Sequence, residues 1–365
     1  MAAILNLFKK KQPDSPELTE LNDQLRTFRG NCALQRVTVG LRNPRTWKFY
    51  DQGDDTKAPI IILPPSGGTP ECFCKLFNDL PEKGIRLIAV QSPPINDHDE
   101  WLESFSGFLD HIKLKKAHIL GCGLGGFLGL LYTRVNPKRV LSIILINSYA
   151  TNINLITSVG KFEFSPAYVI KDYLTRGFEV EGNTVNGKQI KNVKPNHKAA
   201  VDFFKAQMGT LSQEELYSSV CLQSTEAFID KRKVDQTKLT IIECDDFSSF
   251  DESMRATLPT FFKNGRYVGL KEGGDFPFLS CAEDISLHIT VHMRRLDPTL
   301  LEAIKLETVP EEVGMERGMV QSKPADEHDE EPEPSPQQTQ NAETGDTGES
   351  SYEYYTATAT EDNDE

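Results

Sequence analysis

The segment HILGCGLGGFLG, residues 118–129, carries two glycine patterns that predict different chemistry. Gly121, Gly123 and Gly126 spell GxGxxG, the pattern with which dinucleotide-binding proteins let the backbone approach a pyrophosphate. Gly121 and Gly125 also frame a GxSxG nucleophile elbow in which Gly123 stands at the serine position. The first pattern predicts a nucleotide site. The second predicts a hydrolase site without its nucleophile.

A dinucleotide site needs a carboxylate about 20 residues further along, at the end of the next strand, to bind the ribose hydroxyls. That distance falls at the end of VLSIILINS, where Asn147 and Ser148 stand. Several strand candidates also precede this glycine loop, whereas a dinucleotide site normally follows the first strand. We therefore favour the elbow interpretation and keep nucleotide binding by GCGLGG as the weakest alternative.

A serine hydrolase also needs a histidine base, an acid that orients it, and amides that bind the oxyanion. The histidine is expected after the last strand, where the sequence reads GGDFP and places Asp275. The acid is expected after LTIIEC, where Asp245 and Asp246 stand; we select Asp246. An oxyanion-type loop is predicted in IIILPPSGGTP, at Pro65, Ser66, Gly67 and Gly68.

These positions predict a degenerate triad of Gly123, Asp246 and Asp275, with no catalytic residues. An aspartate cannot replace a histidine base near neutral pH without an extreme pKa shift. Cys122 is the alternative nucleophile, since it stands beside the elbow, but strand alternation predicts that it packs into the core. His98, in NDHDEW, is expected to be a solvated loop residue.

The apolar runs and their spacing predict an α/β fold. Strands are expected at LQRVTVG, TWKFYDQG, IIILPP, IRLIAVQ, AHILG, VLSIILIN, LTIIEC and RYVGLKEG, with amphipathic helices such as EWLESFSGFLDHI and GFLGLLYTRV between them. Apolar strands that alternate with helices indicate a mostly parallel sheet with helices on both faces. About 90 residues between Asn147 and Leu239 carry further helical patterns, which predict an inserted helical cap at about 150–237.

Charge and composition divide the 365 residues into three expected parts. Residues 1–30 are expected to be an N-terminal extension and residues 31–309 the folded domain. Residues 310–365 contain 17 acidic and two basic residues and so carry −15, whereas the rest of the chain carries +1 and the whole chain −14. Its low apolar content predicts a disordered acidic tail.

The nearly neutral remainder argues against a nucleic-acid groove, which needs a basic excess. No run approaches the roughly 18 apolar residues of a membrane span, so a soluble chain with at most peripheral membrane association is expected. Seven irregularly spaced cysteines fit reduced thiols in the cytosol. Neither the CFC triplet at Cys72 nor the HITVH segment at His288 has a complete metal-ligand set, so no metal and no cofactor are predicted.

The order of the oxyanion-type loop, the elbow strand and the cap resembles an α/β-hydrolase over residues 31–300. More narrowly, FRG at 28–30, LPPSGGTPECF, LDHIKLKKAHILG, LGGFL and KEGGDFPFL resemble the maspardin family of hydrolase-like proteins. The resemblance implies a role in vesicle traffic between endosomes and the trans-Golgi network, through binding of a membrane receptor's cytoplasmic tail. Relatives commonly keep a serine at the elbow, so Gly123 departs from them, as do the acidic tail and the N-terminal extension.

The sequence therefore predicts a noncatalytic binding or adaptor protein of the cytoplasm, at most peripheral on endosomal or trans-Golgi membranes. Its expected partner is a protein, with no nucleic acid. A cryptic hydrolase that uses Cys122 is the first alternative, and a nucleotide-binding protein is the second.

Overall fold

The computed structural model describes residues 14–156, 160–178, 193–246, 249–250 and 252–298, with three short strand segments between 180 and 189. The chain divides into a compact unit, Met1–Pro310, and a second unit, Glu311–Glu365. The predicted acidic tail lies outside the described residues.

An eight-stranded sheet forms the centre of the first unit, in the order β1-β2-β4-β3-β5-β6-β10-β11. Strands β1 and β2 pair antiparallel, as do β2 and β4, and the remaining pairs are parallel. All eight predicted strands are present: β1 Gln35–Val39, β2 Arg45–Gln52, β3 Ile60–Leu63, β4 Leu87–Gln91, β5 Ala117–Cys122, β6 Val140–Ile146, β10 Leu239–Cys244 and β11 Arg266–Leu270. The predicted α/β class with a mostly parallel sheet is confirmed.

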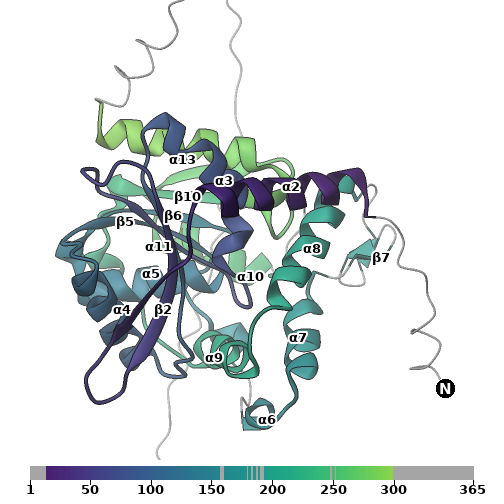
Figure 1. Cartoon of the computed structure of the whole chain (residues 1–365), viewed down its shortest axis with the longest axis horizontal. Helices are drawn as coiled ribbons and strands as arrows, with labels where there is room; N and C mark the ends of the chain where they lie inside the picture. The colour runs from purple at the N-terminus through teal and green to yellow at the C-terminus, as the bar shows by residue number, and fades with distance from the viewer. Residues whose placement is uncertain are drawn as a thin grey trace, which may run out of the picture. The chain divides into compact units, whose positions relative to one another are not determined.

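Both faces of the sheet are buried, which explains why its central strands are mostly apolar on both sides. Ile60 and Ile62 of β3 pack into one core, whereas Ile61 and Leu63 pack into another. The first core includes α3 (Cys74–Asp79) and α13 (Ala282–Leu296), and the second includes α4 (His98–His111), α5 (Leu124–Val135) and α11 (Thr257–Phe261). Figure 1 shows α3 and α13 on one side of the sheet and α4 and α5 on the other.

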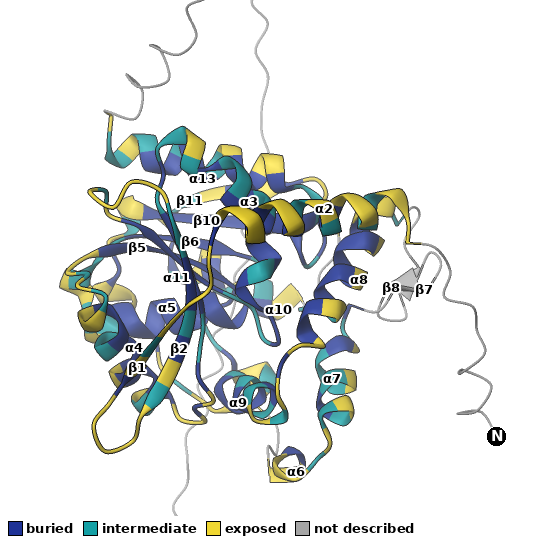
Figure 2. Cartoon of the chain, in the orientation of Figure 1, coloured by how far each residue is buried: buried dark blue, intermediate teal, exposed yellow. Residues whose placement is uncertain are grey.

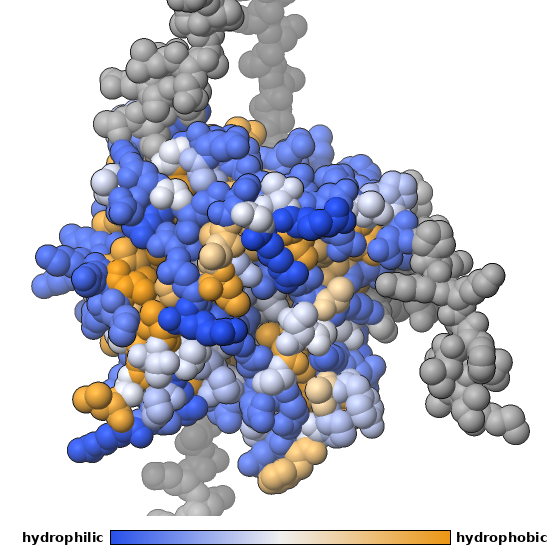
Figure 3. Space-filling model, in the orientation of Figure 1, coloured by the Kyte–Doolittle hydropathy of each residue, from blue (hydrophilic) through white to orange (hydrophobic). Residues whose placement is uncertain are grey.

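Helix α2, Pro16–Asn31, belongs to the compact unit, so the domain boundary predicted at residue 31 lies inside this unit. Ser15 caps the helix by accepting the N–H of Leu18, and Pro16 occupies the first turn. Leu21, Leu25 and Phe28 form a buried stripe with helical spacing. The outer sides of α2 and α13 are exposed (Figure 2) and mostly hydrophilic (Figure 3).

The segment between β6 and β10 forms the helical insertion at the predicted position. Its helices are α6 Gly160–Glu163, α7 Ala167–Thr175, α8 Pro195–Met208 and α9 Gln213–Ser224, with short strands β7 Val180–Glu181, β8 Thr184–Val185 and β9 Lys188–Gln189. Helix α8 packs on α2. Helix α9 is held by Ser218, whose hydroxyl accepts the N–H of Ile95 and donates to its carbonyl. The remaining helices, α10 Glu252–Arg255 and α12 Pro277–Ser280, follow β10 and β11.

A buried hydrogen-bond chain joins β5, β6, β10 and α13. The Ser142 hydroxyl lies 2.7 Å from Nδ1 of His118 and 2.8 Å from Nε2 of His292. The Thr240 hydroxyl lies 2.8 Å from the other ring nitrogen of His292. Burial lowers the pKa of His118 to about 4 and the pKa of His292 to about 3, so both rings are neutral in the folded protein.

We expect acid to destabilise the protein through these two histidines. Their folded-state pKa values lie below the unfolded value of about 6.5, so the unfolded chain binds more protons as the pH falls through 6.5 toward 4. The two neutral histidines therefore contribute their full share to the free energy of unfolding above pH 6.5. At pH 5 the contribution of each histidine is lower by roughly 2 kcal/mol. Urea unfolding at pH 7 and pH 5 measures the difference. His118→Gln should reduce it, whereas substitution of the exposed His111 serves as the control.

Candidate functional site

Gly123 occupies a sharp turn between β5 and α5, with φ of +50° and ψ of −118°. A residue with a side chain is strained in this conformation, and glycine is not. The turn is held from both sides, because the Gly123 N–H donates to the Ile146 carbonyl and its own carbonyl accepts the Ser148 hydroxyl at 2.8 Å. The strand, turn and helix are those that an elbow requires.

Two further glycines let α5 lie directly against the sheet. A Cβ on Gly125 would lie 2.1 Å from the Leu63 carbonyl oxygen, and a Cβ on Gly121 would lie 2.3 Å from the Gly126 Cα. Both neighbours are backbone atoms, which cannot move aside as a side chain can. Packing of α5 against the sheet therefore excludes any side chain at Gly121 and Gly125.

The predicted oxyanion-type loop lies beside the elbow. Gly67 has φ of +71°, and the Gly68 N–H donates to the Pro65 carbonyl at 2.8 Å, which closes a tight turn. Pro65 is the nearest neighbour of the elbow, since a Cβ on Gly123 would lie 3.3 Å from the Pro65 Cβ. The Ser66 hydroxyl oxygen is buried and has no hydrogen-bond partner among the described residues.

Asp275 lies at the position predicted for the histidine. Its Oδ1 accepts the Ser249 N–H at 2.7 Å and the Ser249 hydroxyl at 2.9 Å. Asp246 accepts the N–H groups of Gly273 and Gly274, each at 3.1 Å. The carboxylate selected as the triad acid thus supports the loop that carries Asp275, although Asp245 and Asp246 are both exposed residues.

Asn147 follows β6 at the point where a dinucleotide site would need a carboxylate. It has φ of +42°, and its amide donates to the Gly274 carbonyl at 2.7 Å while its Oδ1 accepts the Cys244 N–H at 3.1 Å. Asn147 therefore connects β6 to β10 and to the Gly273–Gly274 turn. This structural role weakens the nucleotide interpretation of the glycine loop.

These segments surround a cavity of about 220 Å³. The elbow contributes Cys122, Gly123 and Leu124, and Asp275 and Ser249 come from the two loops after β11 and β10. Most other lining residues are apolar or aromatic: Pro65, Ile146, Leu155, Tyr173, Leu174, Phe178, Phe250 and Phe276. Ser66, Asn147 and Gln223 add polar groups, with Gly177 completing the lining. No histidine is among these described lining residues.

Cys122 both packs in the core and lines the cavity, although strand alternation predicted the core alone. The residue is 2% exposed, and burial raises the pKa of its thiol well above the usual range. A thiol attacks as its thiolate, so this environment disfavours nucleophilic chemistry.

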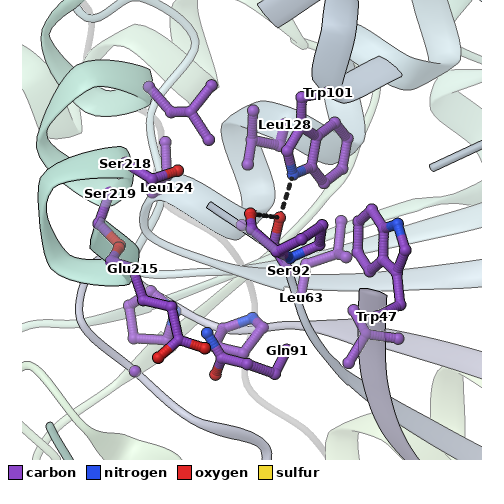
Figure 4. Close-up of a pocket in the computed structure, with 17 residues that line it drawn as sticks. Trp47, Leu63, Gln91, Ser92, Trp101, Leu124, Leu128, Glu215, Ser218 and Ser219 are labelled. Atoms are coloured by element: carbon purple, nitrogen blue, oxygen red, sulfur yellow. Dashed lines mark hydrogen bonds between the residues drawn. The ribbon is translucent and has the colours of Figure 1, made fainter. Parts of the chain in front are cut away.

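A second cavity, of about 50 Å³, shares the lining residues Pro65 and Leu124 with the first (Figure 4). Glu215, Ser218 and Ser219 face it from α9, and the Trp101 indole N–H donates to the Ser92 hydroxyl at its opposite wall. A cavity of this volume has room for only a few waters. Of these two cavities beside the elbow, the one of about 220 Å³ is therefore the candidate site for an organic ligand.

Two histidines make buried contacts that the sequence patterns did not indicate. The prediction that His98 is solvated is wrong: Asp97 caps α4 just before it, and the buried ring lies 2.8 Å from the Leu222 carbonyl of the cap. His197, on α8, is buried near Asp246 and Gly273, and burial lowers its pKa to about 4. Both contacts join segments far apart in sequence, which periodicity cannot reveal.

Within the described ranges, no group of three or more His, Cys, Asp or Glu side chains is placed to bind a metal ion. Cys72 and Cys74 are buried free thiols. The same part of the chain contains no helix of sufficient length and hydrophobicity to span a membrane.

Comparisons with known proteins agree with this geometry. Residues 58–220 match the family model for the alpha/beta hydrolase fold. Maspardin from Danio rerio is 32% identical over 290 residues, which cover 78% of this chain and 90% of the relative. The chain belongs to the maspardin family.

Maspardin from Homo sapiens is also similar, with 31% identity over 301 residues that cover 79% of this chain and 94% of the relative. Among solved structures, a thermophilic esterase from Thermogutta terrifontis gives a TM-score of 0.57 at 15% identity and covers 72% of this chain and 98% of that chain. At this identity the likeness establishes the fold alone. The chain is thus a member of the maspardin family with an α/β-hydrolase fold.

Proposed function

We propose that this maspardin-family chain is a noncatalytic binding protein that uses the hydrolase fold as an adaptor. The observation that carries this proposal is the elbow itself: its backbone has the strained conformation of a nucleophile position, but the residue there is Gly123. Asp275 stands at the base position and is engaged by Ser249. An acyl transfer by the usual mechanism lacks both nucleophile and base.

The proposed setting is membrane traffic between endosomes and the trans-Golgi network, with the cytoplasmic tail of a membrane receptor as the partner. This part of the proposal rests on the resemblance to maspardins. The proposed role includes a cytoplasmic location with peripheral association with those membranes.

Affinity purification from cells tests the adaptor function directly. The full chain and a version that ends at Thr308 should both recover a membrane receptor or its cytoplasmic tail if the folded unit carries the binding face. Recovery by the full chain alone would assign binding to the segment after Thr308. Failure of both versions to recover a receptor-derived partner would contradict the adaptor proposal.

A cryptic cysteine hydrolase is the alternative to exclude by measurement. We expect no turnover of ester, thioester or amide substrates above a buffer control, because the Cys122 thiol is buried with a raised pKa and the described cavity lining offers no histidine. The matched pair is Cys122→Ala and Cys221→Ala, since Cys221 is a buried thiol of the cap. Turnover that Cys122→Ala abolishes and Cys221→Ala preserves would establish the hydrolase instead.

A further inference from the structure

We propose that the amino-terminal edge of the parallel strands binds the surface of a membrane that contains anionic phospholipids. The inference rests on the proposed function, because it assigns a surface to the peripheral membrane association. Ten exposed lysines and arginines define this surface, which we name the basic edge: Lys113, Lys115, Lys116, Lys138, Lys231, Arg232, Lys233, Lys238, Lys263 and Arg295.

The order of the strands brings these cations together. Strands β5, β6, β10 and β11 are neighbours in the sheet and run parallel, so the segments that precede them lie side by side at one edge. Residues 113–116 precede β5, 137–139 precede β6, 231–238 precede β10 and 263–265 precede β11. The cluster is not visible as a run in the sequence, because the four segments are far apart along the chain.

Direct contacts join the segments of the basic edge. The Arg139 guanidinium donates to the Leu114 carbonyl at 2.6 Å, which connects the segment before β6 to the segment before β5. The short helix Gln236–Lys238 contacts β6. The Arg295 guanidinium, at the end of α13, donates to the Thr237 carbonyl at 2.9 Å. The basic edge is therefore one continuous surface.

Positive charge outweighs negative charge along this surface. Three nearby aspartates form ion pairs with neighbouring bases: Asp110 with Arg139, Asp230 with Arg232, and Asp235 with Lys238. Two of the ten cations of the basic edge belong to these pairs, so the excess of positive charge remains large. Such a cluster attracts anionic headgroups, and each lysine or arginine near the membrane surface strengthens binding.

The opposite edge of the same strands has the opposite charge. The loops that follow β10 and β11 carry four acidic residues and Lys271: Asp245, Asp246, Glu272 and Asp275. The net charge of the whole chain, −14, repels an anionic membrane, so attraction requires this segregation of charge. Gly123 follows the carboxyl end of β5, so binding through the basic edge directs the elbow away from the membrane.

Exposed apolar side chains beside the cations favour a lipid bilayer over a nucleic acid. Val135 ends α5 and is 53% exposed, and Phe228 is 68% exposed. Both lie at the basic edge, because Val135 precedes the turn that carries Lys138, and the Arg134 side chain donates to the Phe228 carbonyl at 2.8 Å. A bilayer interface accepts apolar side chains between its headgroups, while lysines attract the headgroup charge.

Sedimentation of the full chain with lipid vesicles tests the proposal. One set of vesicles contains phosphatidylcholine with about 30% phosphatidylserine, and the other contains phosphatidylcholine alone. We expect the full chain to bind the anionic vesicles at least about tenfold more tightly at about 0.1 M salt. Most of this difference should disappear at about 1 M salt, because the screening length falls from about 10 Å to about 3 Å.

A triple variant, Lys115→Gln with Lys116→Gln and Lys138→Gln, should weaken binding to the anionic vesicles by about tenfold to a hundredfold. The three side chains are exposed, so the melting temperature should be nearly unchanged. The matched control removes the same charge from three exposed lysines of the cap and the opposite edge, and it should bind as the natural chain does: Lys194→Gln, Lys198→Gln and Lys271→Gln.

Phe228→Ser preserves every charge and should weaken binding to the anionic vesicles about threefold or more, because it removes an exposed ring from the bilayer interface. Equal binding to the two kinds of vesicle, or equal effects of the two triple variants, would overturn the proposal. Binding to a DNA duplex without binding to the anionic vesicles would also overturn it and assign the basic edge to nucleic acid. Recovery of a receptor tail without vesicle binding would contradict this inference and leave the adaptor function intact.

Discussion

Gly125→Ala should destabilise the protein by about 3 kcal/mol or more, because it forces a methyl group into the backbone of β3. The added Cβ would lie 2.1 Å from the Leu63 carbonyl oxygen, far inside van der Waals contact. The higher helix propensity of alanine opposes this effect by only about 1 kcal/mol. Folding free energies of domains are about 5–15 kcal/mol, so much of the expressed variant should be insoluble. Chemical unfolding of the soluble fraction measures the loss.

Gly30→Ala is the matched control for this substitution. Gly30 also lies in a helix, α2, but a Cβ at Gly30 meets no atom within 4 Å. The same chemical change should therefore stabilise the protein by about 0.5–1 kcal/mol. Similar stability changes in the two variants would show that α5 does not lie against the backbone of β3.

The strands and the elbow could be predicted because their signals are local. A run such as IIIL has the length of a strand and no polar face, so it belongs in a sheet covered on both sides. The elbow glycines are equally easy to recognise in the sequence. Gly121 and Gly125 must be glycine because their backbone neighbours exclude any side chain. Spacing in the sequence was sufficient to find both.

Helix α2 shows a signal that was present but assigned to an extension. Ser15 and Pro16 mark a helix start, and Leu21, Leu25 and Phe28 recur at helical spacing. Phe28 is fully buried and its ring centroid lies 4.6 Å from that of Tyr50 in β2. Most other residues of this helix are charged or polar, so the composition of the segment alone does not reveal the apolar stripe.

The composition of the cavity could not be predicted, because its walls come from segments far apart along the chain. Ser249 meets Asp275 across 26 residues, and the cap supplies Tyr173 and Phe178. His98 lies under the cap for the same reason, since its partner Leu222 is 124 residues away. Local patterns determine which element forms, whereas these contacts depend on where the insertion folds back over the sheet.

The double variant Gly123→Ser with Asp275→His should acquire reactivity toward a fluorophosphonate probe, because it places serine and histidine at the expected nucleophile and base positions. The serine needs only a small adjustment: its Cβ would lie 3.3 Å from the Pro65 Cβ, which must shift by a few tenths of an ångström, and 3.8 Å from the Phe250 Cζ. Asp246 is the expected acid, because it accepts the N–H groups of Gly273 and Gly274 directly before residue 275. Gel fluorescence after probe labelling should be at background for each single variant and clearly above it for the double variant.

Stability supplies the second measurement on the same three variants. Gly123→Ser places a side chain on a residue with φ of +50°, which should cost about 1–3 kcal/mol. Asp275→His removes the acceptor of the two Ser249 hydrogen bonds and should also destabilise, by roughly 1–3 kcal/mol. If Gly123→Ser is as stable as the natural chain and the double variant remains unlabelled, the turn at Gly123 is not a catalytic elbow that has lost its serine. Labelling confined to the double variant would instead show that two substitutions separate the natural chain from a reactive hydrolase site.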